Sequence, residues 1–375
     1  MNLTYWEQTA FFPPCDIAIV GGGLVGLSTA ISLKEKAPYL NVVVLERGNL
    51  PSGASTRNAG FACFGSLTEI LADIHSMGEE AAVSLIEMRI KGLEMLRARL
   101  GDSAIQYQHL GGFEIFLDED ETFHACLEAM PRINRAVAGW TGMANCYELA
   151  DARIPELGLR SVKHLIVNHA EGQLHPGFMT QRLQELAQRK GIRLTSGQSV
   201  SEITSEKGRF TLQLENGANI RANKVVLANN AFARQFLPEL PVIAVRNQVL
   251  LSEPIPGLSL KGCFHFHEGY VYARNVGTRL LIGGGRHLDP QGEQTADFGA
   301  HPEIREYLET FAKKHLCDHP NLSFSTQWSG ILSSGPEKRP IVQEVEPGLF
   351  VAVRLSGMGV AIGSLIGEEV SERVL

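Results

Sequence analysis

The sequence predicts an α/β protein, α+β overall, in which a Rossmann-like nucleotide-binding domain carries an inserted domain built on an antiparallel sheet. Three observations lead to this prediction. An apolar run of strand length, 16–20, enters a glycine motif, 21–26, and a helical stretch follows. Segments of similar character recur at 172–230 and 349–363. Between them, residues 242–285 alternate in the manner of antiparallel strands.

The glycine motif is typical of a dinucleotide-binding βαβ unit. Gly21 permits a tight turn, Gly23 lets the backbone approach a pyrophosphate, and Gly26 lets helix and strand pack closely. The first helical turn offers free N–H groups and a positive dipole end to the phosphates. Glu46 ends a second apolar run and is placed to accept hydrogen bonds from an adenosine ribose. The predicted contacts of this unit are Gly21, Gly23, Leu24, Val25, Gly26, Glu46 and Arg47.

The predicted nucleotide-binding domain is discontinuous. We assign 1–80, 160–235 and 335–375 to it, and 81–159 and 236–334 to the substrate-binding domain.

Local patterns place individual elements. Residues 67–100 have helical periodicity, and a helix over 178–190 ends before Gly191, a suitable C-terminal glycine. Turn residues at 215–217 and 275–277 predict two hairpins.

Composition and charge exclude several classes of protein. The net charge is −7 and the pI about 6.0, without a basic tract, which argues against a nucleic-acid partner, including tRNA. No apolar run is long enough for a transmembrane helix, and the first residues do not read as a secretion signal. The six cysteines are scattered without a Cys-x-x-Cys motif, which favours reduced thiols and a cytoplasmic location.

A second glycine- and hydroxyl-rich loop, 47–61, follows the ribose-binding acid. Its backbone N–H groups and the side chains of Ser55 and Arg57 suit a pyrophosphate, and 58–60 admits a flat ring close to the main chain. An ordinary polar surface loop is the alternative interpretation. A nicotinamide enzyme does not usually need such a loop, so it favours a flavin.

Four motifs in the expected order resemble the FAD-dependent D-amino-acid oxidase superfamily. They are the glycine motif, Gly-Ala-Ser-Thr-Arg-Asn-Ala-Gly at 53–60, Val-Val-Leu-Ala-Asn-Asn-Ala at 225–231, and Ser-Gly-Met-Gly at 356–359. The 53–60 loop is most similar to the branch containing glycine/sarcosine oxidase and γ-glutamylputrescine oxidase. The resemblance implies a Rossmann-like FAD-binding domain with the flavin facing the inserted antiparallel sheet.

The resemblance also implies specific FAD contacts. A helix that begins near Val360 would direct its N-terminus toward the flavin O2 carbonyl and stabilise the anionic reduced flavin. Val200 would contact the adenine through its backbone. Beyond the glycine motif, the implied contacts are Ala54, Ser55, Arg57, Asn58, Ala59, Gly60, Val200, Asn229, Gly357, Met358, Gly359 and Val360.

The chain departs from the superfamily at three places. Leu332 stands where simple amino-acid oxidases carry the arginine that binds the substrate carboxylate, and we expect Arg339 or Arg354 to replace it. Ala361 stands where sarcosine-oxidase-like relatives carry a lysine. Ser329 and the histidine-free segment 53–61 stand where relatives attach the flavin covalently, so non-covalent FAD is expected.

Substrate contacts are expected from the inserted sheet. Tyr270 and Tyr272 share a strand face, and Tyr270 matches a tyrosine that relatives place over the flavin. His265-x-His267 has same-face spacing but no evident third ligand, so no metal site is predicted. The catalytic candidates are Tyr270, Arg339 and Arg354, and the substrate-binding candidates are Tyr272, Arg246, Arg286 and His287.

We interpret the chain as an FAD-dependent amine or amino-acid oxidase or dehydrogenase that oxidises a C–N bond to an imine by hydride transfer to flavin N5. Such catalysis needs positioning and stabilisation of the reduced flavin rather than a strong general base. The expected partners are a small amine or amino acid and oxygen or another electron acceptor. Three alternatives stay open: a flavin dehydrogenase of a hydroxy acid or polyol phosphate, a non-catalytic FAD-fold protein, and an NAD(P) enzyme.

Overall fold

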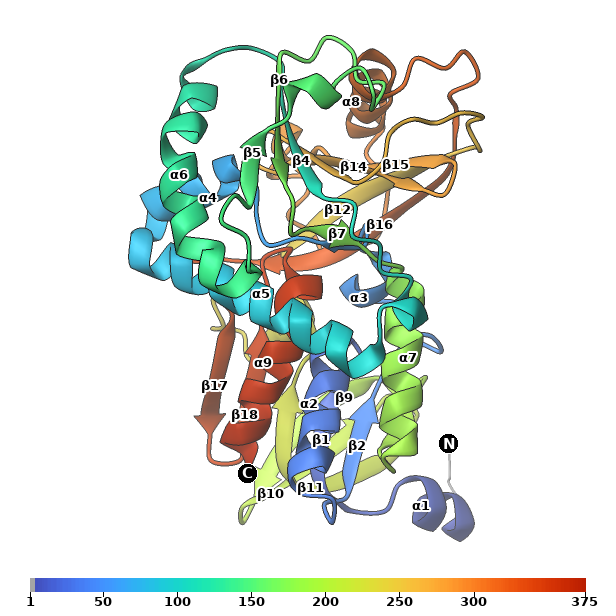
Figure 1. Ribbon diagram of the computed structural model, residues 1–375. Helices are drawn as coiled ribbons and strands as arrows, with labels where there is room; N and C mark the ends of the chain where they lie inside the picture. The colour runs from blue at the N-terminus through green and yellow to red at the C-terminus, as the bar shows by residue number, and fades with distance from the viewer. Residues whose placement is uncertain (1–3) are drawn as a thin grey trace.

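Two sheets organise the computed structural model, which describes residues 4–375 (Figure 1). The first sheet has the order β17-β18-β11-β1-β2-β8, with β10 paired to β11 and β9 to β10. Strands β18, β11, β1, β2 and β8 run parallel, while β17 and the β9–β10 ribbon are antiparallel. The strands are β1 (Cys15–Val20), β2 (Val42–Leu45), β8 (Arg193–Thr195), β9 (Val200–Glu206), β10 (Arg209–Leu214), β11 (Asn219–Leu227), β17 (Ile341–Glu346) and β18 (Leu349–Val353).

Helices α2 (Leu24–Lys36), α5 (Glu79–Leu100), α7 (Pro176–Arg189) and α9 (Gly359–Val374) share the core of the first sheet. Glycines allow the helices to approach closely. A Cβ at Gly367 of α9 would lie 2.5 Å from the Ser28 Cβ, and one at Gly92 of α5 would lie 2.3 Å from the Ala361 carbonyl oxygen. These contacts fix the position of the α9 N-terminus. Helix α1 (Tyr5–Phe11) precedes the sheet and buries no residue.

The second sheet has the order β16-β12-β15-β14-β13-β4-β6-β5. Helix α8 covers one face, and α4, α5 and α6 share the core on the other. The elements are α4 (Leu67–Met77), β4 (Gly112–Phe116), α6 (Glu121–Thr141), β5 (Tyr147–Leu149), β6 (His164–Asn168), β12 (Ile243–Ser252), β13 (Cys263–Phe266), β14 (Val271–Val276), β15 (Arg279–Gly284), α8 (Pro302–Phe311) and β16 (Phe324–Ser334). The short strands β3 (Phe61–Ala62) and β7 (Gly172–Gln173) form a separate two-stranded sheet. Helix α3 (Ala54–Arg57) directly precedes β3 in the chain.

The predicted fold class is confirmed, with differences at the predicted boundaries. Strand β6 lies after residue 160 yet pairs with β4 and β5 of the second sheet. Helix α5 begins at Glu79 and continues far past the predicted boundary at 80/81, yet it packs against α9 and contributes to the first core. The helical stretch 67–100 is two helices, because Gly78 adopts φ +83 between them.

One helix end and two hairpin turns lie where the sequence predicts them. Helix α7 ends just before Gly191, at φ +75, and the hairpins β10–β11 and β14–β15 turn at Gly217 and Gly277, both with positive φ. Within the described chain, no helix combines the length and apolarity needed to cross a bilayer.

Candidate active site

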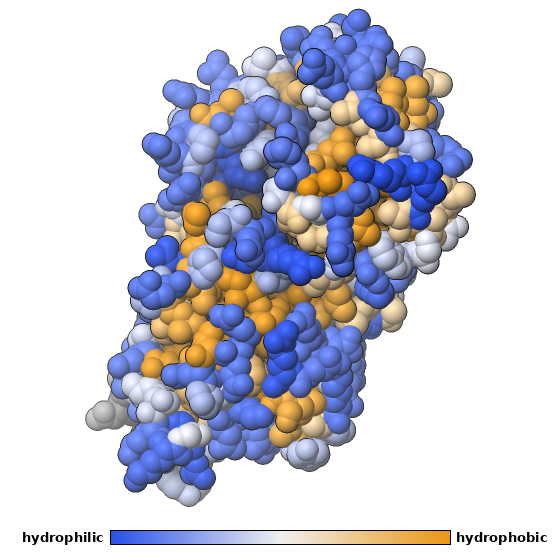
Figure 2. All heavy atoms as spheres, turned by 90° about the vertical axis from the view of Figure 1, so that its left-hand side faces the viewer, coloured by the Kyte–Doolittle hydropathy of each residue, from blue (hydrophilic) through white to orange (hydrophobic). Residues whose placement is uncertain are grey.

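A cavity of about 540 Å³ extends from the carboxyl ends of the first sheet's parallel strands to β14 and β16 of the second sheet. The size is typical of ligand sites, and strand carboxyl ends are where α/β folds bind ligands. Apolar side chains also reach the surface between the two halves of the molecule (Figure 2). The predicted residues that line the cavity are Gly21, Gly23, Leu24, Val25, Glu46, Arg47, Ala54, Ser55, Arg57, Asn58, Ala59, Val200, Asn229, Tyr270, Tyr272, Arg286, Gly357, Met358, Gly359 and Val360.

The glycine motif forms one end of the cavity. Gly21 adopts φ +114, and the Leu24 N–H at the start of α2 donates to the Ser55 Oγ at 2.8 Å. Gly26 does not line the cavity; a Cβ there would lie 2.0 Å from the Gly21 carbonyl oxygen. Gly26 therefore keeps helix and strand in contact, while the N-terminus of α2 and Ser55 present donors to an anion.

Glu46 is held rigidly beside the motif. Its Oε2 accepts from the Gly22 N–H and its Oε1 from the Gly48 N–H, both at 3.0 Å. The carboxylate lines the cavity with lone pairs left to accept from hydroxyl groups. This is the arrangement that a ribose requires at the end of β2.

The 53–60 loop is organised mainly by its own hydrogen bonds. The Asn58 amide donates to the Ala54 and Ser55 carbonyls and accepts from the Gly60 N–H. Gly60 does not line the cavity; its φ is +78, and a Cβ would lie 2.3 Å from the Leu174 carbonyl oxygen. Arg57 donates to the Ser329 carbonyl and lies over the Phe298 ring. These contacts position the loop against β16.

The N-terminus of α9 also lines the cavity, next to the glycine motif, because Gly363 of α9 packs against Leu24 of α2. Gly357 adopts φ +88, and a Cβ there would meet no atom within 4 Å. Met358 caps the helix without a side-chain acceptor, and its first turn carries no acid. The free N–H groups of Gly359 and Val360 are therefore available to an electronegative group.

Unpartnered polar atoms at the cavity wall also fit a hydrogen-bonding ligand. The Asn229 Oδ1, the Asn247 Oδ1 and the Ser356 Oγ are buried without a hydrogen-bond partner among residues 4–375, and all three residues line the cavity. Buried polar atoms are normally satisfied, so these atoms indicate a ligand with several donors and acceptors.

Aromatic and cationic side chains form the other end of the cavity. The Arg286 guanidinium carbon lies 4.7 Å from the centroid of the Tyr270 ring. Within the described chain, Arg286 has no carboxylate partner. Burial raises the pKa of Tyr272 to about 12, so its phenol stays protonated and can donate. This end can therefore receive an anion beside an apolar surface.

Four predicted substrate or catalytic residues do not line the cavity: Arg246, His287, Arg339 and Arg354. Arg246 pairs with the buried Glu293 at 2.7 Å. His287 packs its ring against Tyr270, His267 and Tyr307.

Arg339 and Arg354 do not reach the cavity either. Arg354 is 5% exposed and donates to the Arg339 and Pro241 carbonyls, and Arg339 donates to the Ser84 hydroxyl. Their guanidinium groups are engaged elsewhere. The structure therefore brings neither guanidinium to the cavity where we expected one to replace the missing arginine.

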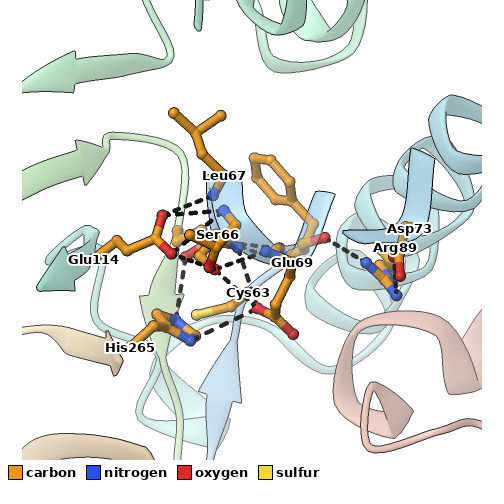
Figure 3. A network of polar contacts seen from close by, with 12 residues as sticks. Cys63, Ser66, Leu67, Glu69, Asp73, Arg89, Glu114 and His265 are labelled. Atoms are coloured by element: carbon orange, nitrogen blue, oxygen red, sulfur yellow. Dashed lines mark hydrogen bonds and ion pairs between the residues drawn. The ribbon is translucent and has the colours of Figure 1, made fainter. Parts of the chain in front are cut away.

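Sequence reasoning missed several charged residues at the cavity. Lys338 lines it and pairs with Asp73 of α4 at 2.5 Å, and Asp73 also lies 3.5 Å from Arg89 of α5. Glu69 and Glu268 line it as well. Figure 3 shows Asp73 beside Arg89, and Glu69 reaching toward His265. Lys338 follows Gly335 in the loop between β16 and β17, and the sequence of this loop does not predict that the Lys338 side chain points into the cavity.

Glu114 joins α4 to the second sheet. Its carboxylate accepts from the Leu67 N–H group (Figure 3). It also accepts from the Thr68 N–H group and the Thr68 hydroxyl. Glu114 is 4% exposed, and burial raises its pKa to about 7, with Glu69 adding to the effect while Thr68 and His265 oppose it. Glu114 therefore anchors a helix that borders the cavity and titrates near neutral pH.

We expect Glu114→Gln to flatten the pH dependence of stability. The pKa rises from an ordinary 4.5 to about 7, so the stabilising contribution is complete below pH 4.5 and is lost as the pH rises through 7. The whole effect is on the order of 3 kcal/mol. Denaturant unfolding across this range measures it, with exposed Glu206→Gln as the control. Equal pH slopes for wild type and Glu114→Gln would contradict the prediction.

A sequence model of the family described as FAD dependent oxidoreductase matches residues 16–373. The chain belongs to this family. The match confirms the predicted resemblance to the D-amino-acid oxidase superfamily. The cofactor is FAD, and since neither Ser329 nor the segment 53–61 offers a cysteine or histidine for attachment, it is bound non-covalently.

Relatives and solved structures agree with the family. The chain is 24% identical to the probable oxidoreductase OrdL of Haemophilus influenzae, over 98% of this chain and 86% of the relative. It is 24% identical to gamma-glutamylputrescine oxidoreductase of Escherichia coli, over 96% and 83%. L-proline dehydrogenase from P. horikoshii has a TM-score of 0.78 at 18% identity, covering 96% of this chain and 93% of that one. Glycine oxidase from Bacillus cereus has a TM-score of 0.74 at 19% identity, covering 96% and 97%.

The residues present fit FAD. The glycine motif, Ser55 and Glu46 suit the ADP half, and the N-terminus of α9 with the unpartnered Asn229 and Ser356 oxygens suits a polar ring edge. When bound, the flavin supplies a hydride acceptor at N5. The chain is an FAD-dependent oxidoreductase.

Proposed function

We propose that this protein oxidises the C–N bond of an amino acid to an imine, with Arg286 as the carboxylate anchor. The observation that carries the proposal is the unpaired Arg286 guanidinium over Tyr270 at the wall of the cavity. A charge-assisted pair with a carboxylate contributes roughly 1.5–3 kcal/mol. Arg286 follows β15 of the second sheet. It would therefore take over, from a different element, the role of the arginine that simple amino-acid oxidases carry at the position of Leu332.

The neighbouring side chains position the substrate. Tyr270 and the protonated Tyr272 offer hydroxyl donors beside Arg286, while Ile331 and Leu332 of β16 line the cavity with apolar surface. Apolar walls exclude water and strengthen the Arg286–carboxylate contact. The substrate amine is then held neutral with its α C–H toward the flavin, which needs positioning rather than a strong base. Oxygen or another acceptor reoxidises the enzyme.

Backbone N–H groups at the N-terminus of α9 would stabilise the reduced flavin. The uncapped N-terminus of α9 directs N–H groups and the positive end of the helix dipole into the cavity. This stabilises the negative charge that builds up on reduction. Ala361, where relatives carry a lysine, leaves this task to the helix.

Anaerobic reduction of the bound flavin tests the proposal. The panel contains free amino acids of both configurations, N-methylated amino acids, the matching decarboxylated amines and 2-hydroxy acids. We expect at least one amino acid to bleach the flavin absorbance, and its decarboxylated amine to do so at least tenfold less efficiently. Reduction by hydroxy acids alone would reject C–N oxidation. Reduction by none of the panel would favour a non-catalytic FAD protein.

A further inference from the structure

Three potential metal ligands meet at the wall of the cavity. The Cys63 Sγ, a Glu171 carboxylate oxygen and a His265 ring nitrogen all lie within 4.8 Å of one another. We refer to these three residues as the Cys63 cluster. Cys63 and His265 line the cavity, and Figure 3 shows them side by side.

The backbone holds the cluster in place from three separate segments. Cys63 follows β3, and Glu171 precedes β7, and these two strands pair through Ala62 and Gly172. His265 lies in β13, which pairs with β4 and β14 of the second sheet. The cluster therefore joins the short β3–β7 ribbon to the second sheet.

The cluster is deeply buried and incompletely satisfied. Cys63 is 3% exposed, Glu171 1% and His265 7%. The His265 Nε2 has no hydrogen-bond partner within residues 4–375 and lies 3.7 Å from the Glu171 Oε2. Burial raises the pKa of both the Cys63 thiol and the Glu171 carboxyl. The Cys63 Sγ lies 3.7 Å from the Gly172 carbonyl oxygen and the Glu171 Oε1 accepts from two backbone N–H groups, so the His265 Nε2 is the group of the three without a partner among the described residues. A buried, unpartnered nitrogen beside an acid and a thiol indicates that a ligand is needed there.

We propose that the Cys63 cluster binds one divalent transition metal ion, with zinc the best match. A dication offsets the charges of the thiolate and the carboxylate, while the imidazole stays neutral. Thiolate, imidazole and carboxylate together are ligands that zinc accepts. At metal–ligand distances of about 2.0–2.3 Å, tetrahedral ligand atoms are about 3.3–3.8 Å apart. For a nitrogen and an oxygen ligand the expected separation is about 3.3–3.5 Å, so the Nε2–Oε2 distance of 3.7 Å is close to it, and the pairs with sulfur need shifts of about 1.3 Å at most.

The surrounding contacts orient the ligands. The second oxygen of Glu171, Oε1, accepts from the Phe64 N–H at 2.7 Å and the Gly65 N–H at 3.0 Å, which leaves Oε2 for the metal. The His265 Nδ1 faces the Glu69 Oε2 at 4.0 Å, so Nε2 points to the cluster. Outer hydrogen bonds of this kind fix metal-binding side chains.

The metal would have one coordination position open toward the cavity, because both Cys63 and His265 line it. Three protein ligands with an open fourth position is an arrangement that admits water or a ligand group. The nearby Cys263 donates to the Gly172 carbonyl at 3.2 Å and is not a member of the cluster.

This inference revises the prediction of no metal site. The sequence pair His265-x-His267 has same-face spacing, but β13 ends at Phe266 and His267 adopts φ +54 in the turn. His267 therefore packs against Tyr270 and His287 instead of joining His265. The other two ligands, Cys63 and Glu171, come from segments that are distant from His265 in sequence.

Metal retention by the FAD-loaded enzyme tests the proposal. The protein is treated with a chelator, supplied with zinc chloride, desalted, and measured by atomic emission and zinc X-ray absorption. We expect about one zinc per chain with one sulfur in its coordination shell. Cys63→Ser and His265→Gln should each lower retained zinc at least tenfold. Cys126→Ser, another fully buried thiol, and His267→Gln are the matched controls and should retain it.

Three results would overturn the proposal. One is wild-type enzyme that retains no stoichiometric zinc after desalting. Another is bound zinc whose absorption spectrum shows no sulfur ligand. This measurement uses the wild-type enzyme, so it tests the proposal even if Cys63→Ser fails to fold. Equal losses in Cys126→Ser and Cys63→Ser would likewise reject the Cys63 cluster. Neither measurement depends on the substrate, so the proposed function is tested separately.

Discussion

Gly26→Ala is expected to lower FAD affinity about tenfold or more and to destabilise the fold. The new Cβ would lie 2.0 Å from the Gly21 carbonyl oxygen, and this contact is with backbone, so the turn or the helix must move. Overpacking of this kind costs about 1–3 kcal/mol. Because the displaced turn is also the end of the cavity where the ADP half is expected, part of that cost falls on FAD binding. Flavin absorbance after desalting and the thermal midpoint measure the two effects.

Gly53→Ala is the matched control. Gly53 also lines the cavity and precedes a helix, but its φ of −82 suits alanine, and a Cβ there would meet no atom within 4 Å. Its FAD content and thermal midpoint should match those of wild type. Gly26→Ala protein that binds FAD as tightly as Gly53→Ala protein would contradict the account of the motif.

Arg286→Ala is expected to lower kcat/KM for the amino-acid substrate by about 10- to 150-fold, the equivalent of one charge-assisted pair. FAD content should not change, because Arg286 lies at the Tyr270 end of the cavity. The decarboxylated amine should react equally with both proteins, since it offers Arg286 no carboxylate. Steady-state kinetics with both compounds measure the difference.

Arg339→Ala provides the comparison for Arg286→Ala. Its side chain lies outside the cavity and donates to the Ser84 hydroxyl on the surface of α5. Loss of this contact should leave kcat/KM within about twofold, as expected for an exposed polar contact. A larger loss in Arg339→Ala than in Arg286→Ala would return the anchor to the residue that the sequence favoured.

The cofactor end of the site could be predicted because its chemistry is local. A tight turn, a close backbone approach and a helix N-terminus each demand glycine at a fixed spacing, so residues 21–26 and 357–359 are recognisable without the fold. The structure places them at the same cavity, although they are more than 300 residues apart.

The substrate end could not be predicted in the same way. Arg339 and Arg354 are near the last strand in sequence, but Arg354 adopts φ +63 and donates to the Arg339 and Pro241 carbonyls, which belong to two other loops. Arg286 and Lys338 come from different elements, and only tertiary packing brings them to the cavity. Proximity in sequence was a poor guide to which guanidinium stays free.

Strand β6 joins a different sheet from the one that the predicted boundaries imply, for a related reason. Strand β6 is short and apolar, and such a run carries no sign of which sheet it will join. Its pairing with β4 and β5 depends on residues more than 15 positions away. The ligands of the Cys63 cluster were likewise invisible, because they lie in three strands or loops with no shared spacing.

The central claim is that Arg286 binds the carboxylate of an amino acid whose C–N bond is oxidised at the flavin. Anaerobic stopped-flow reduction of wild-type and Arg286→Ala enzymes, with an amino acid and with its decarboxylated amine, tests it most directly. The account predicts that the amino acid loses its advantage over the amine, about 10- to 150-fold, when Arg286 is removed. An advantage of the same size in both enzymes would contradict it.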